Sequence, residues 1–117
     1  MESDKNIEIK EKSETMKESD KNTVEKDANN VVVIDFMAEW CGPCKMQDPI
    51  IEEMKKKFEG KATFKKIDID KDGELANKYN VMAVPTLIIE KDGNIFKKYV
   101  GVTRSKELEN TINDALK

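Results

Sequence analysis

The chain of 117 residues contains no histidine and only two cysteines. Structural zinc sites need four cysteine or histidine ligands, so one molecule cannot assemble such a site, and we expect neither a metal nor a cofactor. Long apolar runs are also absent. No run approaches the roughly 18 residues that a membrane-spanning helix needs, so we expect no membrane partner. The N-terminus lacks a basic segment followed by an apolar stretch, which argues against a signal peptide and favours the cytoplasm.

An excess of positive charge is missing as well. Residues 1–30 hold nine acids and six lysines, whereas residues 31–117 hold 15 acids and 15 bases. The net charge of -3 therefore lies entirely in the first 30 residues. Because the lysines are scattered among acids and form no patch, we expect no nucleic-acid partner.

The first 30 residues contain few apolar side chains and a short repeat, in which the sequence of residues 2–6 recurs at residues 18–22. Such a composition cannot bury much apolar surface. We predict that residues 1–12 form a disordered or frayed charged extension. Residues 13–117 are predicted to form a single domain, most clearly from Val31 onward.

From Val31 the hydrophobic pattern predicts strands and helices in the order β-α-β-α-β-β-α. The expected strands are residues 31–36, 62–69, 86–90 and 94–100, and the expected helices are residues 43–58, 74–79 and 105–116. The order favours an α/β fold with a central mixed sheet of four to five strands. The sheet should be parallel at first, end in an antiparallel hairpin, and carry helices on both faces.

The two cysteines lie three positions apart, in Trp40-Cys41-Gly42-Pro43-Cys44, directly after the apolar run at residues 31–36. Thiols at that spacing meet across one helical turn, so they can form and break a disulfide within one small loop. A strand that delivers such a pair to the start of a helix is typical of a thiol–disulfide redox site. A pair of inert buried thiols is the alternative.

Several separated motifs accompany the cysteine pair. They are Asp35-Phe36, Ala38-Glu39-Trp40, Lys45, Pro49, Lys66, Val84-Pro85-Thr86, Asp92-Gly93 and Gly101. With these motifs at these intervals, the chain from about residue 31 to residue 116 resembles the thioredoxin family. The resemblance implies the thioredoxin fold and a protein-disulfide reductase activity. It also implies electrons from a thioredoxin reductase, disulfide-containing proteins as substrates, and a monomer.

Within this resemblance the two thiols have different roles. Cys41 is expected at the N-terminus of a helix, where free N–H groups and the helix dipole stabilise a thiolate, so it is the predicted nucleophile. Cys44, one turn further in, is predicted to be more shielded and to act as the resolving thiol.

Two charged residues belong to the same predicted site. A carboxylate in a buried apolar strand is unfavourable unless it is paired or has a task, and the resemblance makes Asp35 the proton acceptor for Cys44. Lys66 matches a family lysine that lies near this carboxylate and tunes it. The alternative for Asp35 is a structural carboxylate in the core with all its hydrogen bonds made. The alternative for Lys66 is an ordinary lysine on the face of a strand.

The remaining site residues concern redox tuning and substrate docking. The resemblance implies a cis bond before Pro85, which faces the cysteine pair, blocks metal capture and places the Val84 backbone where an extended substrate segment can pair with it. The predicted substrate-binding residues are Trp40, Ala83, Val84, Pro85 and Gly101. Gly42 and Pro43, between the cysteines, are predicted to tune the pair toward reduction, because oxidising and isomerising relatives typically carry histidine there.

Three other functions compete with disulfide reduction. A disulfide isomerase or oxidase would use the same cysteines. A redox-silent binding module would use only the predicted substrate-binding residues around them. Residues 68–73 have the opening spacing of a calcium loop, but Tyr79 occupies its twelfth position, which argues against calcium. Met37 and Ala83 stand where the family often has tryptophan and glycine.

Overall fold

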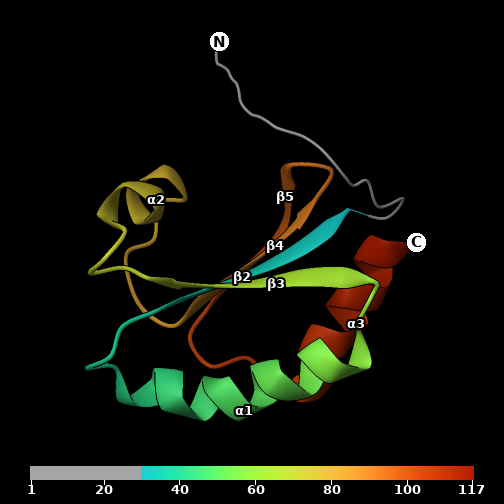
Figure 1. The fold of residues 1–117 in the computed structure, drawn as a ribbon, viewed down its shortest axis with the longest axis horizontal. Helices are drawn as coiled ribbons and strands as arrows, with labels where there is room; N and C mark the ends of the chain where they lie inside the picture. Colours follow the sequence, from blue (N-terminus) through green and yellow to red (C-terminus); the bar gives the residue numbers. More distant parts are fainter. Residues whose placement is uncertain (1–29) are drawn as a thin grey trace, which may run out of the picture. The chain divides into compact units, whose positions relative to one another are not determined.

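The computed structural model describes residues 30–117, so the predictions for the extension, its repeat and the domain boundary after residue 12 lie outside the described residues. The described part holds four strands and three helices in the predicted order. The strands are β2 (Val31–Met37), β3 (Ala62–Asp68), β4 (Thr86–Lys91) and β5 (Asn94–Val100), and the helices are α1 (Gly42–Lys57), α2 (Gly73–Lys78) and α3 (Ser105–Leu116) (Figure 1). No predicted end differs from the observed end by more than one residue.

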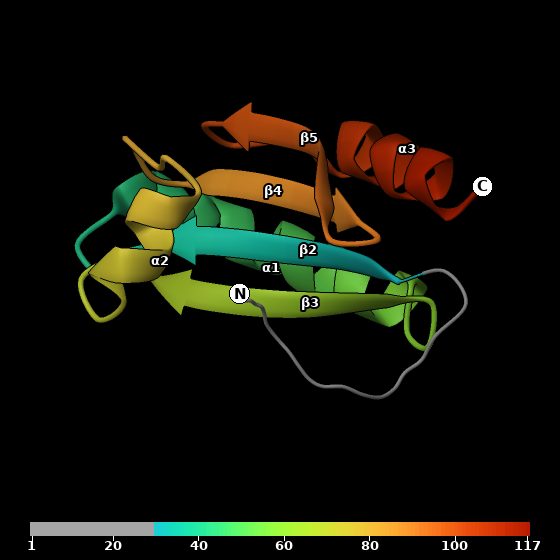
Figure 2. The same ribbon diagram turned by 90° about the horizontal axis from the view of Figure 1, so that it is seen from above.

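The four strands form one mixed sheet in the order β3-β2-β4-β5 (Figure 2). Strand β2 is parallel to β3 and antiparallel to β4, and β4 and β5 form an antiparallel hairpin. Strand β2 has a hydrogen-bonded neighbour on each side and helices on both faces of the sheet, which explains why its residues other than Asp35 are apolar on both faces.

Helices α1 and α3 cover one face of the sheet, and α2 covers the other (Figure 1). Side chains alternate between the two faces along a strand. Val31 and Val33 therefore pack in the cluster that contains residues of α1 and α3, whereas Ile34 and Phe36 pack toward α2. By the same alternation, Asp35 lies on the α1 face.

Helix α1 carries the second cysteine, and its sequence explains where it begins. Cys41 is the N-cap residue, with extended backbone angles, and Pro43 lies in the first turn, where no backbone donor is needed. Lys55, Lys56 and Lys57 occupy the last turn, where positive charge favours the negative end of the helix dipole. Within residues 30–117 no helix has the length and apolar character to span a bilayer.

Candidate redox site

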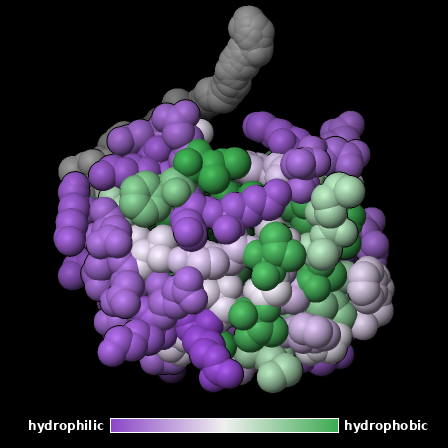
Figure 3. Space-filling model, turned by 180° about the vertical axis from the view of Figure 1, so that it is seen from behind, coloured by the Kyte–Doolittle hydropathy of each residue, from purple (hydrophilic) through white to green (hydrophobic). Residues whose placement is uncertain are grey.

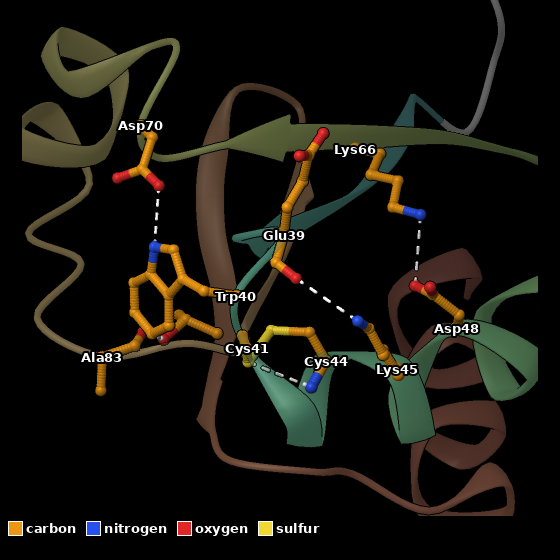
Figure 4. Close-up of a disulfide and its surroundings, with 10 residues drawn as sticks. Glu39, Trp40, Cys41, Cys44, Lys45, Asp48, Lys66, Asp70 and Ala83 are labelled. Atoms are coloured by element: carbon orange, nitrogen blue, oxygen red, sulfur yellow. Dashed lines mark hydrogen bonds and ion pairs between the residues drawn. A yellow bond between two sulfur atoms is a disulfide. The ribbon is translucent and has the colours of Figure 1, made fainter.

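Cys41 and Cys44 form a disulfide across the first turn of α1, with their Cα atoms 5.3 Å apart (Figure 4). The backbone N–H of Cys44 donates a hydrogen bond of 3.1 Å to the Sγ atom of Cys41. The N-cap position also places Cys41 at the positive end of the helix dipole. Both features favour a negative charge on Cys41 once the disulfide is reduced.

Burial does not distinguish the two cysteines. Each is 3% exposed, and both pack with Ala38 in one small cluster against which Met37 and Val84 lie. The greater shielding predicted for Cys44 is therefore not seen in the disulfide form, because the bond holds both side chains in the same cluster. Their positions on the helix are what differ.

Of the predicted substrate-binding residues, Trp40 directly precedes Cys41 and Val84 packs against the disulfide cluster. The Val84–Pro85 bond is cis, as the resemblance implied, and the Gly101 N–H donates a hydrogen bond of 2.8 Å to the Pro85 carbonyl. Gly101 has a φ of 96°, a left-handed conformation that side chains other than glycine rarely adopt. Trp40 is 69% exposed, and Ala83 is also exposed.

Further hydrophobic side chains are exposed on the described domain. They include Met46, Met82, Val100 and Val102. Seen from the β5 side, most hydrophobic surface of the described domain lies in one half, and hydrophilic side chains cover much of the other half (Figure 3). Exposed apolar surface of this kind suits contact with another protein.

Trp40 is oriented by the acidic turn that follows β3. Its indole N–H donates a hydrogen bond of 2.8 Å to Asp70 (Figure 4). The backbone N–H of Asp70 in turn donates a hydrogen bond to the Asp68 side chain. Asp72 accepts a hydrogen bond from Leu75 and so caps α2. These carboxylates therefore accept hydrogen bonds that hold Trp40, the turn after β3 and the start of α2 in place. The described residues contain no group of three side chains suited to hold a metal ion.

A buried amide ties α1 to the segment that carries Gly101. The side chain of Gln47 is fully buried; it donates a hydrogen bond of 3.0 Å to the Thr103 carbonyl and accepts one of 2.7 Å from the Thr103 N–H. This contact was not predicted from the sequence. The sequence offered one signal for it: Gln47 lies one turn before Ile51 on the side of α1 that should otherwise be apolar, and a buried polar side chain needs a hydrogen-bond partner.

We expect Gln47→Leu to destabilise the fold by about 2–4 kcal/mol, because it leaves the buried N–H and C=O of Thr103 without partners. Urea denaturation measures the effect. Thr103→Val is the matched control: it keeps both backbone contacts with Gln47 and should cost less than about 1 kcal/mol. Equal losses in the two variants would contradict a structural role for the amide.

Asp35 lies beneath the disulfide helix on β2, where it is only 2% exposed. Neither of its carboxylate oxygens has a hydrogen-bond partner among the described residues. Burial raises the pKa of Asp35 from 3.8 to about 6; the nearby Asp48 carboxylate raises it as well, and Lys66 lowers it. A carboxyl group in this state can accept a proton near neutral pH.

Lys66 is the strand neighbour of Asp35 in the β2–β3 register, as predicted for a residue near this carboxylate. Its ion pair, however, is with Asp48 of α1, at 3.2 Å (Figure 4). Asp48 was not among the predicted site residues. Nothing in its local sequence marks it, because its partner lies 18 positions away on another element.

A disulfide closed across the N-terminus of a helix, above an α/β sheet with a buried carboxyl group on the same face, is typical of a thiol–disulfide oxidoreductase. Comparisons with known proteins agree with this class. The family model described as Thioredoxin matches residues 11–114. The chain therefore belongs to the thioredoxin family.

Individual relatives are similar over most of their length. A rice thioredoxin of the H type is 50% identical over 90 residues, which are 77% of this chain and 72% of that protein. Thioredoxin of Bacillus subtilis is 39% identical over 101 residues, 86% of this chain and 97% of the relative. A solved structure of a mutant thioredoxin from Halobacterium salinarum superposes with a TM-score of 0.70 at 37% identity, over 76% of this chain and 77% of that one.

Proposed function

We propose that this protein is a general protein-disulfide reductase that works as a monomer in the cytoplasm and receives its electrons from a thioredoxin reductase. The observation that carries the proposal is the disulfide between Cys41 and Cys44, with Cys41 at the N-cap of α1 and exposed apolar residues around it. Gly42 and Pro43 between the cysteines support the direction of transfer, since no side chain there adds a positive charge that would stabilise the thiolate further.

The first chemical step belongs to Cys41. In the reduced protein its thiolate attacks one sulfur of a substrate disulfide, a Cys41–substrate disulfide forms, and the other substrate sulfur leaves as a thiolate. The helix N-terminus favours the required charge before attack. Cys44 keeps its proton during this step.

The second step belongs to Cys44 and Asp35. Asp35 accepts the Cys44 proton, directly or through water, and the Cys44 thiolate attacks the Cys41 sulfur of the mixed disulfide. The Cys41–Cys44 bond forms, and the second substrate sulfur leaves. Two electrons have then passed to the substrate, whose two thiolates take up two protons.

Substrate docking is proposed for Trp40, Ala83, Val84, Pro85 and Gly101. Val84 lies partly buried against the disulfide cluster, so an extended substrate segment that pairs with its backbone would bring a substrate sulfur toward Cys41. The Trp40 ring, held by Asp70, would cover apolar substrate surface beside it.

Insulin reduction tests the proposed function. With dithiothreitol as electron source, the protein should accelerate insulin precipitation well above the uncatalysed rate. Its redox potential in glutathione or dithiothreitol buffers should lie near the value of about −270 mV that is typical of thioredoxins. An unaccelerated reaction, or a potential close to the value of about −120 mV found in strong oxidants, would contradict it.

A further inference from the structure

Lys66 does not pair with the buried carboxyl group beside it. Although it is directly opposite Asp35 in the β2–β3 register, its ammonium lies 3.2 Å from the Asp48 carboxylate, one turn beyond Cys44 on α1 (Figure 4). Both oxygens of Asp35 lack a hydrogen-bond partner in the described part of the chain. Asp48 and Asp35 therefore compete for one ammonium group, and Asp48 holds it.

The three side chains line the same small cavity between α1 and β3, which has a volume of about 90 Å³. The side chains of Asp48 and Lys66 are 40% and 53% exposed, whereas Asp35 is 2% exposed. The cavity thus leads from the surface to the buried carboxyl group, and it has room for water. The ion pair stands at its outer end.

We propose that Asp48 is a positioning residue for Asp35: it holds the Lys66 ammonium at the mouth of this cavity and away from the Asp35 carboxylate. The catalytic consequence of this arrangement rests on the proposed function, in which Asp35 accepts the proton of Cys44. The placement of the ammonium does not depend on that function.

The arrangement controls how readily Asp35 takes up a proton. The charged residues that line the Asp35 cavity are Asp48, Glu52 and Lys55 of α1 and Lys65 and Lys66 of β3; of the two lysines of β3, Lys66 has its side chain on the Asp35 face of the sheet. The other strand beside Asp35, β4, places the uncharged Leu87 opposite it. If Lys66 paired with Asp35 directly, it would hold the pKa of that carboxyl group down. By engaging Lys66, Asp48 keeps the pKa high, and its own negative charge acts in the same direction.

A higher pKa makes Asp35 a stronger base for the resolving step. The proton leaves the Cys44 sulfur, binds an Asp35 oxygen and later passes to solvent through the cavity, while the S–S bond between Cys41 and the substrate breaks and the Cys41–Cys44 bond forms. Proton transfer follows the basicity of the acceptor. Loss of Asp48 should therefore slow resolution without affecting the first attack by Cys41.

The first test is direct titration of Asp35 by carboxyl ¹³C NMR in the oxidised protein, where no thiol titrates. Asp48→Asn should lower the pKa of Asp35 by about one unit, and Asp48→Glu, which can keep the ion pair, should restore most of it. Glu52→Gln is the matched control, because it removes one negative charge from the same cavity wall but leaves Lys66 paired. A shift as large as that of Asp48→Asn would overturn the proposal.

A second comparison separates positioning from simple repulsion between carboxylates. In a Lys66→Met background there is no ammonium to release, so Asp48→Asn should shift the pKa of Asp35 by less than half of its effect in the unmodified protein. An undiminished shift in that background would show that Asp48 acts only through its own charge, and it would overturn the proposed positioning role.

Kinetics supply the last readout. At pH 7, Asp48→Asn should slow resolution of a preformed Cys41 mixed disulfide about two- to four-fold and leave the rate of its formation unchanged. A shifted Asp35 titration with unchanged resolution would mean that Asp35 is not the proton acceptor, which refutes the proposed role of Asp35 but not the placement of Lys66. An unshifted titration would refute the positioning role of Asp48 itself.

Discussion

Cys41→Ser is expected to abolish disulfide reduction, so that insulin precipitates no faster than with dithiothreitol alone. A serine hydroxyl is not ionised at neutral pH, and the helix N-terminus that favours a thiolate at this position cannot make it a comparable nucleophile. The fold should persist, because serine is smaller than cysteine and the disulfide closes only a four-residue loop. Circular dichroism of the variant provides that control.

Cys44→Ser should give a different result. Attack by Cys41 still occurs, but no resolving thiol remains, so the mixed disulfide with the substrate should accumulate as a covalent complex that dithiothreitol releases. Non-reducing electrophoresis with an excess of a disulfide-bonded protein measures it. The double variant Cys41→Ser/Cys44→Ser should capture nothing. Capture by Cys41→Ser in place of Cys44→Ser would reverse the two assigned roles.

Asp35→Asn should make the protein more stable at neutral pH while it slows catalysis. In the folded protein the pKa of Asp35 is raised from 3.8 to about 6. At about pH 3 and lower the carboxyl group is mostly protonated in both the folded and the unfolded state, so its charge has little effect on stability. As the pH rises from about 3 to about 7, the unfolded chain loses this proton first, and the free energy of unfolding falls by about 3 kcal/mol in total.

Urea denaturation of the two proteins at pH 4 and at pH 7.5 tests this linkage. The stability advantage of the asparagine variant should be about 2.5 kcal/mol larger at pH 7.5 than at pH 4, since every other titrating group is common to both proteins. A difference that does not change with pH would contradict the raised pKa. Resolution of the mixed disulfide should be slower in the variant near pH 7, and the deficit should shrink at alkaline pH, where hydroxide can take the Cys44 proton in place of Asp35.

Most of the fold followed from local patterns. The β-branched run at residues 31–36 identified the central strand, and the Lys91-Asp92-Gly93 turn identified the final hairpin; Asp92 and Gly93 both adopt positive φ there. These features depend on neighbours in the sequence, so a single chain suffices to predict them. The cysteine pair is likewise local, because a spacing of three positions and a helix start bring the sulfurs together.

The contacts that refine the site are not local. Gln47 and Thr103 are 56 positions apart, and Lys66 meets Asp48 only because β3 packs beside α1. The equal burial of Cys41 and Cys44 also depends on which residues cover them, here Ala38, Met37 and Val84. Motifs and periodicity indicate which side chains have the chemistry for catalysis. Which acidic side chain a lysine such as Lys66 pairs with depends on tertiary packing, which the sequence pattern does not show.

Strand β2 has a consequence for how the protein meets many different substrates. It is hydrogen-bonded on both sides, and such central strands open only when the whole domain unfolds. Asp35 lies within it, and the disulfide follows shortly after its end, so we expect local opening to disturb these reacting groups little. Met82 and Ala83, in contrast, lie exposed in the segment before β4, outside any helix or strand. If Ala83 contacts substrates as proposed, the docking segment can adjust to a partner without displacing the reacting groups, because the two are carried by different parts of the described domain.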